Sequence, residues 1–432
     1  MKKFFIPPKK SYVIPFLAST FYFPLLKIMR NIRSIVISDE DREMLKNYKN
    51  KRLLFFSNHP STSEPPIVFY LSKIVGEPFY YMASRQVFNW QGGVMGFLIR
   101  RLGAFSVIAG IPDRESLKMA REILSRPNGK LVIFPEGEPT SGENDNLMPF
   151  QPGVAQLGFW GLDEARQKDP AADIEVVYCF MKYVIDVPRE TILADLENSL
   201  SRLEKRLGLA KNNKHILHRF LTVGRVLLEN GEKEYKITPP PEADFDYRVG
   251  RLRHAMLDGI AERLGINPYH PQDDAITKWR KIFAIIELLE LNYPDPKLPK
   301  VSKADVKWAH KEANLIFDFI VMKRDYILSY PSAERLYEWL DRFESFLYKK
   351  MPRALGGVPS HLPRRAHLLF AKPFPLSRYY TTDRKKRKEA VEKLTQNLRQ
   401  EMESLLQKAQ PLTPPLFSPE EIQKVREAIR DR

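Results

Sequence analysis

Residues 52–64 read Arg-Leu-Leu-Phe-Phe-Ser-Asn-His-Pro-Ser-Thr-Ser-Glu, and this stretch determines the fold that we expect. The apolar run that opens it is short and uninterrupted, which is typical of a buried strand. Pro65 and Pro66 follow, where the first turn of a helix tolerates proline, and the helix continues to Val75. A strand, a polar loop that carries His59, and a helix together indicate one unit of an α/β fold.

The rest of the chain divides into an α/β part and a helical part. Strand-like apolar runs alternate with helical segments up to about residue 188, and the pattern is then almost entirely helical to about residue 344. We therefore predict an α/β fold with a mostly parallel or mixed sheet flanked by helices, and with a large all-helical insertion. The expected strands are 52–56, 79–82, 103–108, 131–134, 174–185 and 367–371, and the expected helices beside them are 39–49, 114–125, 154–167 and 383–407.

His59 lies where the first of these strands ends, and Glu64 follows where the next helix begins. In parallel sheets, ligands gather at the carboxyl ends of the strands. The spacing lets the Glu64 carboxylate fold back onto the imidazole and keep one ring nitrogen protonated, which leaves the other nitrogen free to remove a proton from a substrate hydroxyl. From these two residues alone, a capping or packing contact is the more usual interpretation.

Three sequence blocks stand at or near the ends of expected strands: Asn58-His59-Pro60-Ser61-Thr62-Ser63-Glu64, Gly103-Ala104-Phe105-Ser106-Val107 and Phe134-Pro135-Glu136-Gly137. In order and spacing they resemble the sequence blocks of the glycerophospholipid acyltransferase family. The first block is similar to the family's His-x4-Asp motif, with Glu64 in the place of the acid. Two later stretches, Met148-Pro149-Phe150-Gln151-Pro152-Gly153 and Ala371-Lys372-Pro373-Phe374, also resemble parts of the family pattern.

The resemblance implies an O-acyltransferase that moves a fatty acyl group from coenzyme A or acyl carrier protein onto the hydroxyl of a lysophospholipid, and 1-acylglycerol 3-phosphate is the acceptor that we expect first. It implies His59 as the general base and Glu64 as the acid that orients it, with no cofactor besides the acyl donor. Contacts with the substrate phosphate are implied for Arg85, Arg114, Glu136 and Gly137. For the oxyanion we expect backbone N–H groups of Ser61, Thr62 and Ser63.

Two positions depart from the family pattern. The second block usually carries an arginine shortly after its Gly-Ala-Phe stretch, but Ile108-Ala109-Gly110 stand there and the first arginine is Arg114. The fourth block normally places a proline in a valine-rich strand, where this chain has Val176-Val-Tyr-Cys179-Phe. Two alternatives therefore stay open: a weak or inactive lipid-binding or regulatory protein on the same fold, and an acyltransferase with a different acceptor.

The charge of the chain points to an anionic partner. The formal net charge is +16, and the first 38 residues hold seven basic side chains and no acidic one. Ser11–Leu26 is an uncharged run of 16 residues. As a helix it would span about 24 Å, less than the ~30 Å hydrocarbon core, and Pro15 and Pro24 interrupt it. We expect residues 1–35 to lie in the interface of an anionic membrane, on its cytoplasmic side, as a peripheral or monotopic element. A hairpin packed on the protein's own core is the alternative.

The domain organisation follows from these patterns. We expect an interface segment at 1–35, the first part of an acyltransferase domain at 36–188, a helical insertion at 189–363, the closing strand and helix of the domain at 364–410, and a C-terminal helix at 411–432. The sequence predicts neither an oligomeric state nor a role for the insertion.

Other classes of function find little support. Cys179 is the single cysteine, so there is no disulfide framework, and we expect it to be a small core residue. The acidic pair Asp244 and Asp246 has no histidine at ligand spacing, so we expect no metal. A Gly-x-Ser-x-Gly elbow is absent, which disfavours a serine hydrolase. The basic run Arg384-Lys-Lys-Arg-Lys388 has no aromatics interleaved, so we expect no nucleic-acid partner.

Overall fold

The computed structural model describes residues 4–140, 144–151, 153–210, 212–350, 360–383 and 385–430. Pro152 and Arg384, which the sequence analysis singled out, lie outside these ranges. The chain divides into two compact units. Unit 1 comprises Met1–Thr140, Asp145–Val184 and Arg364–Pro411, and unit 2 comprises Ser141–Asn144, Ile185–Pro363 and Leu412–Arg432.

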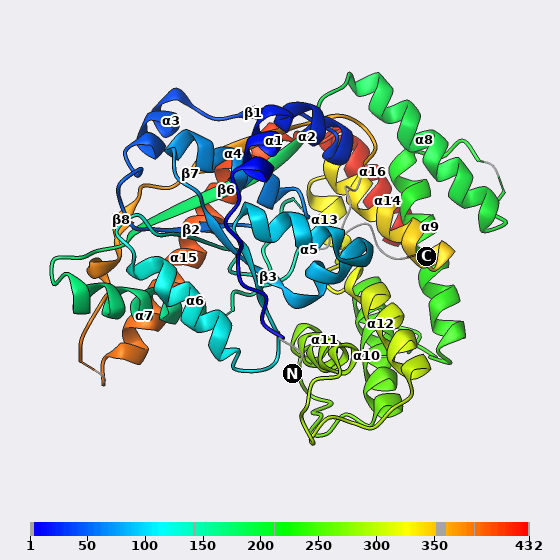
Figure 1. The fold of residues 1–432 in the computed structure, drawn as a ribbon. Coiled ribbons are helices and arrows are strands. Elements are labelled where there is room, and N and C mark those ends of the chain that lie inside the picture. The colour runs from blue at the N-terminus through cyan, green and yellow to red at the C-terminus, as the bar shows by residue number, and fades with distance from the viewer. Residues whose placement is uncertain are drawn as a thin grey trace. The chain divides into compact units, whose positions relative to one another are not determined.

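Unit 1 is built on an eight-stranded sheet (Figure 1). Its strands are β1 Ile32–Val36, β2 Leu53–Ser57, β3 Tyr80–Ser84, β4 Ala104–Val107, β5 Lys130–Ile133, β6 Glu175–Ile185, β7 Arg364–Phe370 and β8 Phe374–Pro375. Their order is β1-β7-β6-β2-β5-β3-β4, with β8 beside β6. β2 is parallel to β5 and β6, β3 is parallel to β4 and β5, and β8 is antiparallel to β6. The predicted fold class is confirmed, and β2 occupies the middle of the sheet.

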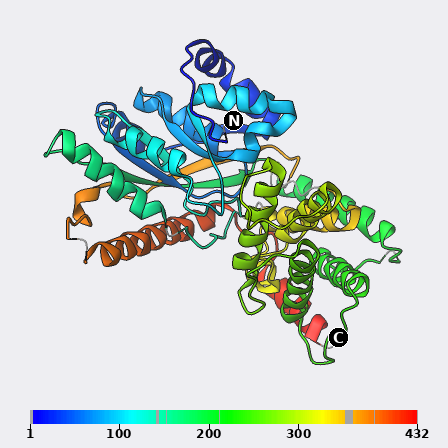
Figure 2. The same ribbon diagram turned by 60° about the horizontal axis from the view of Figure 1, so that its bottom comes forward.

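Helices cover both faces of this sheet, and successive side chains of β2 pack against one face and then the other. Phe55 belongs to the core that α2, α3 and α4 share. Phe56 points to the other face, where it contacts Tyr178, whose hydroxyl donates to Asn397 of α15. Figure 2 shows α15 (orange) and the N-terminal helices (blue) on opposite sides of the sheet.

The helices of unit 1 are α1 Val13–Thr20, α2 Tyr22–Arg30, α3 Asp39–Lys46, α4 Glu64–Val75, α5 Val94–Ile99, α6 Arg114–Ser125, α7 Gly153–Lys168 and α15 Arg387–Ala409, with 3-10 turns η1 Arg85–Gly93, η2 Arg100–Leu102, η4 Leu376–Arg378 and η5 Gln410–Leu412.

Local signals in the sequence fix several of these helices. The Ser38 hydroxyl accepts the N–H of Asp41 at the start of α3, and the Asp113 carboxylate accepts the N–H of Ser116 at the start of α6. On the last helix of unit 1, the buried side chains recur at helical spacing and form one apolar row: Ala390, Leu394, Leu398, Met402 and Leu405. Cys179 is a buried free thiol, as expected.

The N-terminal segment differs from the expectation in two respects. Residues 32–36 form β1, which pairs in parallel with β7, so the sheet begins within the segment assigned to the membrane interface. The helix break falls at Phe21, between α1 and α2, whereas Pro15 and Pro24 lie in the first turns of the two helices. In the described residues, no single helix is long and apolar enough to cross a membrane; α1 and α2 meet that test only together, as a pair bent by 74°.

Apart from Ile185 at the end of β6 and one isolated bridge between Ser332 and Pro415, the regular secondary structure in the described residues of unit 2 is helical. Buried leucines such as Leu196, Leu200 and Leu203 recur at helical spacing on one face of the first helix of this unit. The helices are α8 Arg189–Arg206, α9 Ile216–Glu234, α10 Phe245–Leu264, α11 Ala275–Leu291, α12 Lys303–Phe317, α13 Arg324–Ser329, α14 Ala333–Tyr348 and α16 Pro419–Arg430.

Candidate active site

The loop after β2 begins with a buried asparagine that ties it to the neighbouring strand. The Asn58 side chain donates to the carbonyl of Met181 at 3.0 Å and accepts the N–H of Met181 at 2.7 Å. It therefore extends the pairing of β2 with β6 by one side chain. His59 comes next, so its backbone leaves the sheet at a fixed point.

Contacts on the main chain and on the ring hold His59 in place. Its N–H donates to Glu136 at 2.8 Å, and its carbonyl accepts the N–H of Thr140 at 2.8 Å. The imidazole stacks on the Phe134 ring, with 4.4 Å between centroids. Its Nδ1 lies 2.8 Å from Oε2 of Glu64. An imidazole held at this many points has little freedom to rotate.

Glu64 occupies the first turn of α4 and is wholly buried, whereas the imidazole it contacts is 15% exposed. Its Oε2 also accepts the N–H of Ser61 at 3.0 Å, and its Oε1 accepts the hydroxyls of Ser61 at 3.1 Å and Tyr183 at 2.5 Å. Both oxygens of this carboxyl group thus accept hydrogen bonds from neighbouring donors. With Glu64 as the acceptor, the proton of the imidazole lies on Nδ1 of His59, and Nε2 is the basic nitrogen.

Tyr183 is the site residue that the sequence analysis missed. Burial and the Glu64 charge raise its pKa well above the ordinary value, so its hydroxyl stays a donor. The Arg364 guanidinium lies 4.7 Å from its ring centroid, and the Arg364 Nη2 donates to the Arg30 carbonyl at 3.1 Å. Alternate residues of β6 from Val177 to Tyr183 share the core with α4. That alternation is hidden in the sequence because both faces of this strand are apolar.

The expected oxyanion donors need a correction. Ser61 gives its N–H to Glu64, and Ser63 gives its N–H to the Ser61 hydroxyl at 3.1 Å. Because both amides are used inside the turn, they do not point to a substrate oxyanion. Thr62 is half-buried beside them, and its role stays a prediction.

Glu136 and Gly137 shape the loop that faces His59. The carboxyl group of Glu136 is buried and accepts the N–H groups of His59 and of Met148, the latter at 2.6 Å. Burial raises its pKa to about 8. Gly137 has φ of +81°, and a Cβ there would lie 2.9 Å from Gln151. We therefore assign Glu136 to holding the His59 backbone, rather than to the substrate phosphate as expected.

The two expected phosphate-binding arginines lie after different strands. Arg85 follows β3, and its guanidinium donates to the Phe4 carbonyl and to Asn89, both at 2.9 Å. Arg114 is exposed at the start of α6, close to β4, because the Asp113 carboxylate accepts the N–H of Ile108 at 3.0 Å and closes the intervening loop. With strands about 4.8 Å apart, β3 lies about 10 Å and β4 about 14 Å from β2. Arg85 therefore begins nearer to His59 than Arg114 does.

The comparison with protein families agrees with this geometry. Residues 36–159 match the family model described as Acyltransferase. They form a domain of the glycerophospholipid acyltransferase family. The match runs from the end of β1 into α7, so it includes the His59 loop and the Glu136 loop of the acyltransferase domain. No curated protein matches the chain.

The surroundings of the acyltransferase site contain no metal-binding group that the structure describes. Among the described residues, no three His, Cys, Asp or Glu side chains come together as metal ligands. A buried ion pair joins Asp145, which follows the Glu136 loop in the chain, to Lys182 of β6. It joins the segment after the Glu136 loop to the strand that carries Tyr183, and so stabilises the frame of the site.

Proposed function

We propose that the acyltransferase domain transfers a fatty acyl group from an acyl thioester to the hydroxyl of a lysophospholipid, with 1-acylglycerol 3-phosphate as the acceptor and His59 as the general base. Coenzyme A or acyl carrier protein supplies the acyl group. The observation that carries the proposal is the 2.8 Å contact between Nδ1 of His59 and the buried Glu64 carboxylate at the end of the central strand.

The reaction follows from the free nitrogen of that imidazole. Nε2 of His59 removes the proton of the acceptor hydroxyl while its oxygen attacks the thioester carbonyl. Glu64 stabilises the imidazolium that forms. The tetrahedral intermediate then collapses by breaking the C–S bond, and the imidazolium returns its proton to the leaving thiolate. The products are an ester and a free thiol, and the enzyme ends in its starting state.

The acceptor phosphate requires a cation at a suitable distance from the base. Arg85 follows the strand two positions from β2 in the sheet, and Arg114 follows the strand three positions away. A guanidinium matches the oxygens of a phosphate in its fork of N–H donors. We propose Arg85 as the principal contact with the phosphate and Arg114 as a secondary one.

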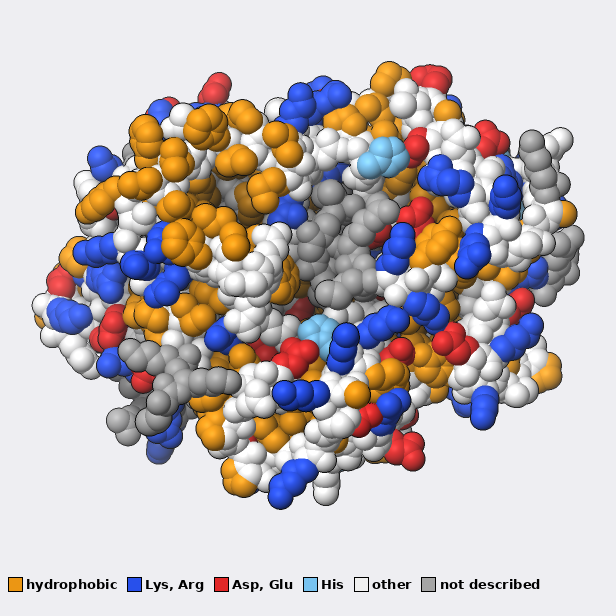
Figure 3. Space-filling view, turned by 45° about the vertical axis from the view of Figure 1, so that its right-hand side comes forward, with side chains coloured by type: hydrophobic (Ala, Val, Ile, Leu, Met, Phe, Trp, Pro, Cys, Tyr) orange, Lys and Arg blue, Asp and Glu red, His pale blue; other side chains and the backbone are white. Residues whose placement is uncertain are grey.

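We also propose that the domain works at the cytoplasmic surface of an anionic membrane. Figure 3 shows hydrophobic side chains gathered on the upper left of one face, with Lys and Arg at their edges. Large apolar side chains are exposed in two parts of unit 1, the N-terminal helices and the segment from η1 to α5. These two parts are neighbours, because α1 contacts η2, which directly follows α5. Such a surface inserts rings and aliphatic chains at headgroup depth, while cations meet anionic lipid. The exposed residues are Tyr12, Val13, Phe16, Leu17, Phe21, Phe23, Leu25, Ile28 and Met29 from the N-terminal helices, and Trp90, Val94, Phe97 and Leu98 from η1 and α5.

An acceptor panel tests the proposed reaction. The purified full-length chain is mixed with an acyl-coenzyme A or an acyl carrier protein thioester, and free thiol release is followed with lysophosphatidic acid, glycerol 3-phosphate and lysophosphatidylcholine as separate acceptors. We expect release that depends on lysophosphatidic acid. Release with another acceptor alone would replace the proposed acceptor, and silence with every acceptor, with vesicle binding intact, would favour a lipid-binding protein.

A further inference from the structure

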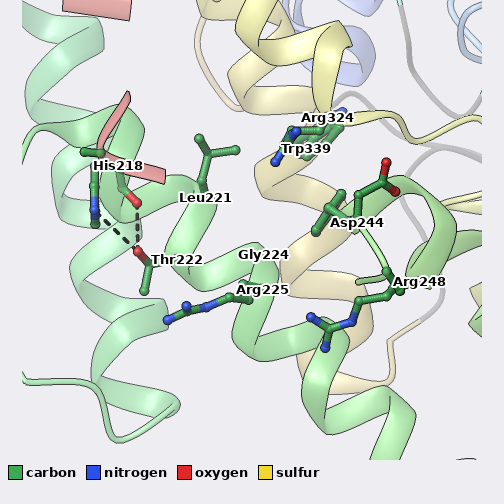
Figure 4. A pocket seen from close by; sticks show the side chains of 12 residues that line it. His218, Leu221, Thr222, Gly224, Arg225, Asp244, Arg248, Arg324 and Trp339 are labelled. Carbon is green, nitrogen blue, oxygen red and sulfur yellow. Dashed lines mark hydrogen bonds between the residues drawn. The ribbon is translucent and has the colours of Figure 1, made fainter. Parts of the chain in front are cut away.

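A cavity of about 190 Å³ in the helical unit is lined by arginines and acids together. Figure 4 shows Arg225, Arg248 and the acid Asp244 in its lining. Glu229 lies 3.8 Å from Arg225. Glu232 contacts Arg248 at 2.9 and 2.5 Å. These acids compensate the two arginines, so we assign no ligand to the cavity.

In unit 1, a side chain of α15 reaches the segment that supports the proposed base. The Arg399 guanidinium donates from Nη1 to the Met148 carbonyl at 2.7 Å and to the Leu147 carbonyl at 3.3 Å. Its Cζ lies 5.2 Å from the centroid of the Phe150 ring. Arg399 is 251 positions from Met148 along the chain, and it lies outside residues 36–159, which match the family model. The contact therefore links α15 to a segment of the matched domain.

Two further hydrogen bonds connect this contact to His59. The Met148 N–H donates to Oε2 of Glu136 at 2.6 Å, and Oε1 of Glu136 accepts the N–H of His59 at 2.8 Å. The Leu147 carbonyl and the Met148 N–H belong to one peptide unit, so Arg399 and Glu136 hold opposite ends of it. Met148 and Glu136 are buried, where a hydrogen bond is stronger than in water. One series of hydrogen bonds thus runs from α15 to the main chain of His59.

Other contacts hold the two ends of the same segment. Before it, Asp145 forms the buried ion pair with Lys182. After it, the Gln151 N–H donates to the Pro135 carbonyl at 2.7 Å. Arg399 holds the middle, at the peptide whose N–H meets the acid of the His59 loop.

Charge also ties Arg399 to this place. One turn further along α15, the Glu403 carboxylate accepts from Nε of Arg399 at 2.5 Å, which orients the guanidinium. Burial raises the pKa of Glu136 to about 8, and the positive charge of Arg399 opposes this rise. Arg399 is therefore near enough to act on the Glu136 charge as well as on the peptide between them.

We propose that Arg399 is a positioning residue for acyl transfer. It fixes the peptide between Leu147 and Met148, this peptide fixes the Glu136 carboxyl group, and Glu136 fixes the backbone of His59. The proposal rests on the proposed function of His59. Because Arg399 acts through Glu136, its loss should lower kcat and leave the binding of both substrates unchanged. α15 then belongs to the frame of the active site, although it lies outside the span that matches the family model.

Thiol release with an acyl-coenzyme A and lysophosphatidic acid tests the proposal. Arg399→Met keeps the aliphatic stem and removes the donors, and should lower kcat about tenfold with both KM values little changed. Arg399→Lys restores a charged donor and should recover most of that loss. In a Glu136→Gln protein, Arg399→Met should cost less than about twofold more, because effects that act through a shared partner do not add. Lys393→Met changes an exposed cation of the same helix and should leave kcat within about twofold.

Hydrogen exchange separates this proposal from the proposed function, because it needs no substrate. In the full-length chain, Arg399→Met should speed amide exchange at least about fivefold in the peptides that contain Met148 and His59, and Lys393→Met should change neither. Thermal melting confirms folding, and Arg399→Gln replaces Arg399→Met if the latter does not fold. If the wild type releases no thiol with any acceptor, the proposed function fails, and the faster exchange still supports the link from Arg399 to His59. Unchanged exchange and kcat in a folded Arg399→Met protein, or a fully additive loss with Glu136→Gln, would overturn the proposal.

Discussion

Replacing Glu64 by glutamine removes one charge from the proposed active site while leaving its shape intact. The glutamine oxygen can take the place of Oε2 and accept from His59 and from the Ser61 N–H, as the carboxylate does. The new amide NH2 then faces the hydroxyls of Ser61 and Tyr183, which can turn to accept. The variant should therefore fold and keep Nε2 of His59 as the basic nitrogen.

The expected loss comes from the missing charge. Two unit charges 2.8 Å apart attract by about 6 kcal/mol at an effective dielectric constant of ~20, which is a ceiling for the stabilisation of the imidazolium. Hydrogen bonds to charged groups contribute about 1.5–3 kcal/mol net. At ~1.4 kcal/mol per tenfold, Glu64→Gln should lower kcat by about 10- to 10²-fold, and by no more than about 10⁴-fold.

Thiol release from an acyl-coenzyme A measures this loss, with KM for the thioester expected to be little changed. Glu40→Gln is the matched control, because Glu40 is exposed on α3 and the same chemical change there should leave kcat within about twofold. A folded Glu64→Gln protein that keeps kcat within threefold of the wild type would refute the role of the carboxylate.

Four further predictions follow. Tyr183→Phe should lower kcat about tenfold with KM unchanged, because one donor to the buried carboxylate is lost. Arg85→Ala should raise KM for lysophosphatidic acid more than Arg114→Ala does, because β3 lies nearer to β2. Leu398→Ala should lower the free energy of unfolding by about 2–5 kcal/mol, because Leu398 is 1% exposed in the core. Burial raises the pKa of Glu136 from 4.5 to about 8. The stabilising contribution of its protonated form is therefore complete below pH 4.5 and is lost as the pH rises through 8. The urea midpoint of unfolding should fall over this pH range in the wild type, and it should fall less in Glu136→Gln.

Each of these has a measurement that would contradict it. Equal kcat for Tyr183→Phe and wild type would deny the tyrosine a positioning role. A larger KM change for Arg114→Ala than for Arg85→Ala would reverse their assignments. Gln400→Ala is the control for Leu398→Ala, because Gln400 lies on the exposed side of α15, and it should change the free energy of unfolding by no more than about 0.5 kcal/mol. An equal loss of stability in the two variants would contradict the packing argument. For Glu136, a urea unfolding midpoint that falls equally with pH in Glu136→Gln and in the wild type would contradict the prediction.

Local patterns predicted most of the acyltransferase domain. The cap residues Ser38 and Asp113, and the five-residue spacing of His59 and Glu64, act over one helical turn or one loop, so they are legible in the sequence. The apolar row on α15 is legible for the same reason, because its helical period depends on near neighbours.

Features that depend on distant partners could not be predicted in this way. β1 reads Ile-Arg-Ser-Ile-Val, which has no strong strand signal, and it is a strand because β7 pairs with it from more than 300 residues away. Tyr183 reaches Glu64 across 119 positions, through a sheet order that no local pattern specifies. The amides of Ser61 and Ser63 were misassigned because a helix start offers N–H groups in general, whereas here an acid and a hydroxyl in the same turn accept them.

The central claim is that His59 is the base of an acyl transfer, and one comparison tests it most directly. Thiol release with an acyl-coenzyme A and lysophosphatidic acid is measured for the wild type, His59→Ala and His270→Ala, in which an exposed histidine of the helical unit is changed instead. We predict a loss of at least about 10²-fold for His59→Ala and full activity for His270→Ala. Acyl transfer that survives in a folded His59→Ala protein would contradict the account.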